Sequence, residues 1–257
     1  MTKTIIIFSE MFIDANSQIL SFKLKNYFLW FILAFNSGCI NIGGFLAAHR
    51  FVTHVTGYAT HFGEELSNGN FGRAYSLLLV PMFFIAGAMI SGWFTEKPEA
   101  TEIKERNHSY IFLAISIILF VISLLGPFGI FGLFGAENEF LPNYFLIALL
   151  AMCSGLQNAM IGTTGGLLVR TSHLTGITTD LAVGLIRISN SKKGSEQRIR
   201  EIKINLLRAG TVGSFIFGSA VASFTFRKFE YAAFLLPAII MGALGYFKSR
   251  HIRRNKL

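Results

Sequence analysis

The sequence predicts an all-α polytopic membrane protein built from two inverted-topology repeats of three transmembrane helices, each repeat with a short Thr-Gly half-helix. The first observation is composition: 52% of residues are hydrophobic and 14% are charged, whereas a soluble domain carries about a quarter charged residues. The second is a series of long uncharged runs. The third is a set of short polar motifs that occurs twice, in the same order, in the two halves of the chain.

The uncharged runs mark six spans, since a helix needs about 20 apolar residues to cross the bilayer core. We expect Gly126-Pro127 to end the third helix, and Pro81 and Pro237 to kink the helices that contain them. The N-terminal residues lack the apolar region and cleavage site of a signal peptide, so we expect a cytoplasmic lead there. The spans cover residues 26–48, 74–95, 109–136, 140–169, 209–226 and 231–247.

The repeated motifs identify a duplicated unit, because their order is the same in both halves. In membrane proteins, ligand sites often lie where two such copies meet. The three pairs are Ser37-Gly38-Cys39-Ile40-Asn41 with Ser154-Gly155-Leu156-Gln157-Asn158, His54-Val55-Thr56-Gly57-Tyr58-Ala59-Thr60 with His173-Leu174-Thr175-Gly176-Ile177-Thr178-Thr179, and Phe84-Ile85-Ala86-Gly87 with Phe215-Ile216-Phe217-Gly218.

The Thr-Gly segments, residues 51–66 and 171–186, are short and contain ionisable groups, so we expect them not to span. Most basic residues then fall on one side, and the loop 127–142, which has no Lys or Arg, falls on the other. The positive-inside rule makes the basic side cytoplasmic, together with both termini. With three spans per repeat, the second copy is inverted. The exceptions to this charge pattern are Arg50, Arg73, Arg227 and Lys228.

The chain accordingly divides into a cytoplasmic lead, two membrane repeats and a basic tail. The second repeat includes a basic cytoplasmic loop, residues 187–208. The lead covers residues 1–25, the first repeat 26–136, the second repeat 137–247 and the tail 248–257.

The Thr-Gly segments predict a solute site. A Thr just before a helix can accept its unpaired N–H groups, and Gly permits the turn into it. Two half-helices entering from opposite faces would point their positive N-terminal ends at the midplane. Simple capping, or helix packing of the small and amide side chains, is the alternative role. The candidate substrate-binding residues are Ser37, Asn41, His54, Thr56, Gly57, Thr60, Asn158, His173, Thr175, Gly176 and Thr179.

Two ionisable residues occupy equivalent positions in the two Thr-Gly segments. Aligning the segments places His61 on Asp180. Ionisable groups at membrane depth are costly and often mark proton pathways, so we expect this pair to approach and to couple solute movement to protons. Contact with headgroups or water is the alternative. His61, Glu64 and Glu65 share a helix face, but no third histidine is near, so we expect no metal site.

The chain resembles the YoaK-type bacterial inner-membrane proteins, a family of unknown function, over roughly residues 26–247. The stretches Gly155-Leu156-Gln157-Asn158 and His173-Leu174-Thr175-Gly176 are the most specific parts of the resemblance. The family's first copy commonly reads Thr-Gly-Asn, whereas Tyr58 follows Thr56-Gly57 here, so no role of that asparagine carries over. The resemblance implies a small polytopic protein of the bacterial inner membrane and supplies no substrate.

We expect a small-solute transporter or channel of the lipid bilayer, because inverted duplication provides alternating access. No nucleotide loop, nucleophile elbow or zinc spacing appears, so we expect neither an enzyme nor a cofactor. The net charge of +9 reflects cytoplasmic loops and tails and not nucleic-acid binding. One alternative is a membrane scaffold or assembly factor whose basic loop binds anionic lipid or a cytoplasmic partner. Another is a lipid-acting membrane enzyme that uses His61, Glu64 and Glu65. Homo-oligomerisation is left open.

Overall fold

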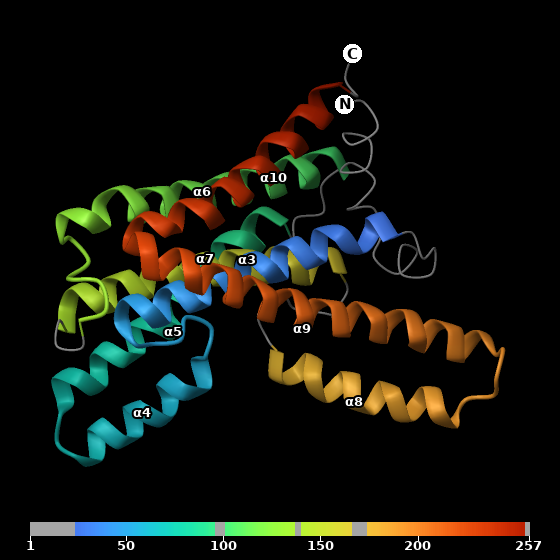
Figure 1. Ribbon diagram of the computed structural model, residues 1–257, viewed down its shortest axis with the longest axis horizontal. Coiled ribbons are helices and arrows are strands. Elements are labelled where there is room, and N and C mark those ends of the chain that lie inside the picture. The colour runs from blue at the N-terminus through green and yellow to red at the C-terminus, as the bar shows by residue number, and fades with distance from the viewer. Residues whose placement is uncertain (1–23, 96–100, 137–139, 166–173, 255–257) are drawn as a thin grey trace.

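The computed structural model describes residues 24–95, 101–136, 140–165 and 174–254, and all regular structure in these residues is helical (Figure 1). The all-α prediction is therefore confirmed for this part of the chain. The helices are α3 (Leu24–Ala48), α4 (Val55–Ser67), α5 (Phe71–Thr95), α6 (Thr101–Leu125), α7 (Phe140–Gly165), α8 (Leu174–Asn190), α9 (Glu196–Phe229) and α10 (Leu235–Arg254), with the 3₁₀ helices η2 (Gly126–Phe128) and η3 (Glu230–Phe234).

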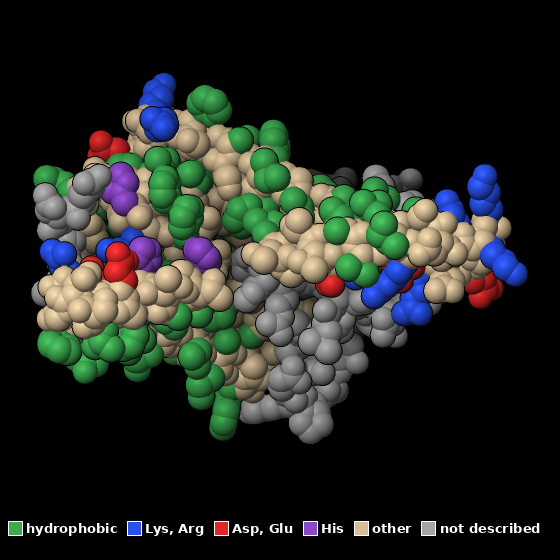
Figure 2. Space-filling view, turned by 90° about the horizontal axis from the view of Figure 1, so that it is seen from below, with side chains coloured by type: hydrophobic (Ala, Val, Ile, Leu, Met, Phe, Trp, Pro, Cys, Tyr) green, Lys and Arg blue, Asp and Glu red, His purple; other side chains and the backbone are tan. Residues whose placement is uncertain are grey.

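Five helical segments are long and apolar enough to cross a membrane, judged by length and composition. The fifth, residues 196–250, covers α9 and most of α10, so each of the six predicted uncharged runs overlaps one of the five segments. The surface is also apolar: Met89, Trp93 and Phe224 are 69%, 70% and 77% exposed, and Figure 2 shows many such side chains on one face. This apolar helical bundle is compatible with a multi-pass membrane protein.

The expected helix breaks agree with the structure in part. Helix α6 ends at Leu125 and Gly126 begins η2, as predicted. Pro81 lies inside α5, which continues on both sides of it. The prediction for Pro237 is wrong, because it is the third residue of α10. The N–H groups of the first turn have no intrahelical acceptor, so a proline there removes no helical hydrogen bond.

The helices pair across the two halves of the chain. Helix α3 packs mainly on α9, α7 on α5, and α6 on α10, while α4 folds onto α5 and α8 onto α9. Each helix of the first half has a counterpart in the second half, and the counterparts are α3 and α7, α4 and α8, α5 and α9, and α6 and α10. When every helix is replaced by its counterpart, the same five pairs result. The duplicated motifs therefore lie on equivalent helices, and the first span of each half packs against the other half.

Repeated glycines allow these helices to cross closely. A Cβ atom on Gly38 of α3 would overlap the carbonyl oxygen of Phe215 on α9, and one on Gly218 would overlap that of Phe35. Small residues let helix backbones approach in this way. Gly218, which belongs to the third repeated motif, therefore serves helix packing. The equivalent contacts between α7 and α5 are Gly155 with Phe84 and Gly87 with Met152.

The main apolar core draws on α3, α5, α6, α7, α9 and α10. Cys39 and Cys153 lie within it as free thiols, and both are 0% exposed. Both are small core residues and form no disulfide.

The two halves differ most in their hairpins. Helices α8 and α9 have 17 and 34 residues, against 13 and 25 in α4 and α5. The α8–α9 hairpin consequently projects from the bundle, at the right of Figure 1. The expected basic loop, residues 187–208, is helical except for 191–195, so the loop prediction is wrong for most of that segment. Of the expected lead, residues 1–23 lie outside the described residues, and Leu24 and Lys25 belong to α3.

Candidate functional site

The first turns of α4 and α8 line a single cavity. Thr56 contributes from α4, and Thr175 and Gly176 contribute from α8, although the two threonines are 119 positions apart. The cavity has a volume of about 480 Å³. The lining is completed by Asn41, Phe51, Thr53, His54, Val55, Leu174 and Phe215.

Asn41 of α3 holds the chain that leads into α4. Its Oδ1 atom accepts the backbone N–H of Val52 at 3.1 Å and the hydroxyl of Thr53 at 3.4 Å. From within α4, Tyr58 donates its hydroxyl to the carbonyl of Phe51, in the same loop, at 2.9 Å. Irregular backbone needs such hydrogen-bond partners when it is not exposed to water, so these side chains fix where α4 begins.

Helix α4 is preceded by His54, not capped by Thr56. His54 occupies the N-cap position and its side chain makes no capping hydrogen bond. Its imidazole lies beside Gly57, where a Cβ atom would come within 2.7 Å of the His54 Nδ1. The prediction that Thr56 caps the helix and Gly57 forms the turn is wrong, because both lie within the first turn. Gly57 instead gives room to the histidine ring.

In α8, Thr175 is the second residue, as Thr56 is in α4. One turn further on, Thr60 donates its hydroxyl to the carbonyl of Thr56 at 3.1 Å, and Thr179 donates to that of Thr175 at 3.0 Å. Thr60 and Thr179 therefore bond to their own helices and do not line the cavity. The predicted site residue His173 lies outside the described residues.

A second cavity, of about 230 Å³, lies beside α4 and shares Phe51 and His54 with the first. Figure 2 shows histidine side chains on this side of the molecule. The Arg50 guanidinium also lines it and sits 5.1 Å from the centre of the Tyr144 ring. The remaining lining residues are His49, Gly57, Tyr58 and His61.

Ser37, Ser154 and Asn158 lie in the helix interface and do not line the larger cavity. They are 6%, 7% and 5% exposed. Gln157 donates from Nε2 to the Ser37 hydroxyl at 2.8 Å, so the first and second copies of the motif contact each other. Gln157 was not among our candidates. The sequence signal that points to Gln157 is an amide side chain within an apolar span and a repeated motif. For Phe215, which lines the larger cavity, the signal is its place in the third repeated motif.

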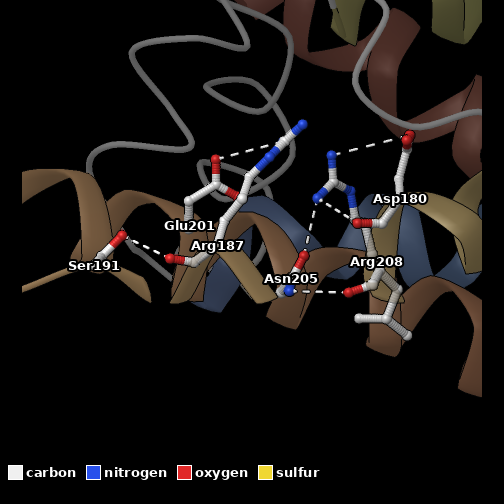
Figure 3. A network of polar contacts seen from close by, with 7 residues as sticks. Asp180, Arg187, Ser191, Glu201, Asn205 and Arg208 are labelled. Atoms are coloured by element: carbon white, nitrogen blue, oxygen red, sulfur yellow. Dashed lines mark hydrogen bonds and ion pairs between the residues drawn. The ribbon is translucent and has the colours of Figure 1, made fainter. Parts of the chain in front are cut away.

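His61 and Asp180 have separate partners. His61 Nδ1 lies 3.0 Å from Glu64 Oε2 on the exposed face of α4. Asp180 Oδ2 lies 3.9 Å from a guanidinium nitrogen of Arg208, which also donates to the Asp180 carbonyl at 3.1 Å and to Asn205 Oδ1 at 2.9 Å (Figure 3). Arg208 is 6% exposed. The direct approach of His61 to Asp180 stays a prediction.

The electrostatics of the larger cavity follow from its lining. Its described lining residues include no carboxylate, and two helix N-termini face it. Helix N-termini present unpaired N–H groups and partial positive charge, which favour electron-rich groups. Within the part of the chain that the structure describes, no group of three or more His, Cys, Asp or Glu residues could hold a metal ion.

Residues 29–247 match a protein-family model whose description is "Protein of unknown function (DUF1275)". No curated protein and no solved structure matches the chain.

Proposed function

The chain belongs to the DUF1275 family of proteins of unknown function, and we propose that it is a multi-pass membrane transporter or channel for a small solute. The observation that carries this proposal is the single cavity lined by the first turns of α4 and α8. Helices interrupted at membrane depth typically mark the binding sites of secondary transporters, because their ends supply polar groups to the solute.

The proposal includes an inverted relation between the two halves. In Figure 1, α3 runs from right to left and its counterpart α7 from left to right, and α6 and α10 are opposed in the same way. The reciprocal pairing of α3 with α9 and of α7 with α5 supports this relation. Two halves so related can rock against each other around a site between them, which is the usual basis of alternating access.

Within the cavity, the solute would meet the Thr56 and Thr175 hydroxyls, the N–H groups of the first two residues of each helix, and the amide of Asn41. His54 lines both this cavity and the smaller one, so it stands where a solute would pass between them. Because the described lining offers hydroxyl and N–H donors and no carboxylate, it suits an anionic or neutral polar solute better than an inorganic cation.

The test is uptake by purified protein in liposomes, using labelled amino acids, carboxylates and sugars. Thr56→Val and Thr175→Val keep the side-chain shape and remove the hydroxyl. We expect uptake to fall about five-fold for each hydroxyl removed, the equivalent of one hydrogen bond, with no matching loss of folded protein.

Thr225→Val is the matched control, because its hydroxyl bonds to the Ala222 carbonyl of its own helix and does not line the cavity. Normal uptake by the folded double variant Thr56→Val/Thr175→Val would contradict the proposed site. Failure of the wild-type protein to move any solute of the panel would contradict transport itself.

A further inference from the structure

The two hairpins carry opposite charge at their tips. The α4–α5 tip has Glu64 and Glu65 against Arg73. The α8–α9 tip, residues 187–203, has six basic residues against two acidic ones, and Figure 2 shows basic side chains at that end of the molecule. The duplication thus produced one acidic and one basic version of the same structural element.

The basic hairpin reaches beyond any single span. At a rise of about 1.5 Å per residue, the 34 residues of α9 extend about 51 Å. The hydrocarbon core of a bilayer is about 30 Å thick. The uncharged part of α9 is residues 209–226, so the N-terminal turns, where basic residues of the hairpin gather, lie outside the hydrocarbon core on the headgroup side.

A cavity of about 480 Å³ lies at this tip, between the end of α8 and the start of α9. Its lining combines cations, hydroxyls and apolar side chains. Arg187 is 3.7 Å from Glu201 and 54% exposed, so its guanidinium still faces outward. Lys192 is exposed and, among the described residues, has no ion-pair partner. The other lining residues that matter here are Ser191, Ser195, Val183 and Ile186.

The turn that carries these cations is held rigidly. The Arg198 guanidinium donates to the carbonyl of Ile188 at 2.6 Å and to that of Ser191 at 3.1 Å. The Ser195 hydroxyl caps α9 by accepting the backbone N–H of Arg198 at 3.3 Å. Lys192 and Lys193 therefore project from an ordered turn, and binding there costs less ordering than it would on a mobile loop.

We propose that the tip of the α8–α9 hairpin binds the phosphate headgroup of an anionic phospholipid. Arg187 and Lys192 of the cavity, together with the adjacent Lys193, supply the positive charge, and Val183 and Ile186 contact the apolar part of the lipid. A basic segment next to a membrane span gains about 1 kcal/mol per Lys or Arg from anionic lipid. The bound lipid would hold the projecting hairpin at the membrane surface. This inference does not depend on transport.

The test is native mass spectrometry of the full-length protein in detergent with phosphatidylglycerol or phosphatidylcholine. We expect wild-type protein to retain phosphatidylglycerol preferentially, and the double variant Lys192→Gln/Lys193→Gln to bind it about five-fold more weakly for each charge removed. Both lysines lie in an exposed turn, so the fold, checked by circular dichroism, should not change.

The matched control is Arg227→Gln/Lys228→Gln, which removes the same charge from the exposed opposite end of α9. This variant should retain the preference for phosphatidylglycerol. An equal loss in both double variants would show a net-charge effect and overturn the site. Equal binding of the two lipids by wild-type protein would also overturn it, as would complete displacement of the lipid by inorganic phosphate.

Discussion

Gln157 of α7 donates from Nε2 to the Ser37 hydroxyl of α3 at 2.8 Å and to the Leu33 carbonyl at 3.0 Å. The contact joins the first spans of the two halves through the same repeated motif. The position equivalent to Gln157 in α3 is Ile40, which is 1% exposed. Because isoleucine has no polar side-chain atom, the first copy of the motif makes no equivalent bond to the second. The contact is therefore an asymmetric feature of the duplicated unit.

Replacing Gln157 with Leu should destabilise the protein by about 1 kcal/mol, because interhelical side-chain hydrogen bonds in membranes contribute about that much. Reversible unfolding in mixed micelles with increasing denaturing detergent would measure the change. Gln197→Leu is the same substitution at an exposed position and should leave stability unchanged. If Gln157→Leu is as stable as wild type, this bond contributes no net stability.

Gly155→Ala should prevent correct packing of α7 on α5. The new methyl would overlap the Phe84 carbonyl, a backbone atom that cannot rotate away. We expect a loss of about 3 kcal/mol or more, seen as a lower melting temperature and poor recovery of folded protein. Gly92→Ala on α5 and Gly213→Ala on α9 point into open space and should stabilise by up to about 1 kcal/mol. Equal tolerance of all three substitutions would rule out a close glycine crossing.

Reporter fusions should reveal an inverted topology. A reporter active only in the cytoplasm should work after Leu257 or within residues 189–195, where the chain turns between α8 and α9. The same reporter should fail near Glu137, since the loop that contains it has no Lys or Arg. Cytoplasmic activity at Glu137 would place an even number of spans in each half and exclude the inversion.

Asp180→Asn should abolish gradient-driven accumulation of the solute while downhill exchange continues, if Asp180 and His61 carry the coupled proton. The substitution keeps size and hydrogen bonding and removes the titrating carboxylate. Because Asp180 lies beside the buried Arg208, stability must be measured in parallel. Glu196→Gln, at the exposed start of α9, removes a carboxylate elsewhere and should change neither property. Continued accumulation by Asp180→Asn would refute the coupling.

The cavity could be anticipated only in part. The repeated Thr-Gly motifs led to Thr56, Thr175 and Gly176, and these residues share one lining. Ser37 and Asn158 carry the same kind of motif signal, yet they are buried between helices. A motif shows that two segments are equivalent, but helix rotation decides which side chains face the cavity.

Hydropathy, repeat order and helix-breaking residues are properties of neighbouring positions, so the sequence by itself determined the helical class, the apolar runs, the duplication and the end of α6 at Gly126-Pro127. The tertiary structure decided what depends on distant partners. Only packing brings Gly38 to Phe215 and Gln157 to Ser37, places the start of α4 at His54, and extends α9 through the basic segment. These contacts join positions more than a hundred residues apart or depend on neighbouring helices. Helix propensity depends on residues close in sequence, so it does not predict them.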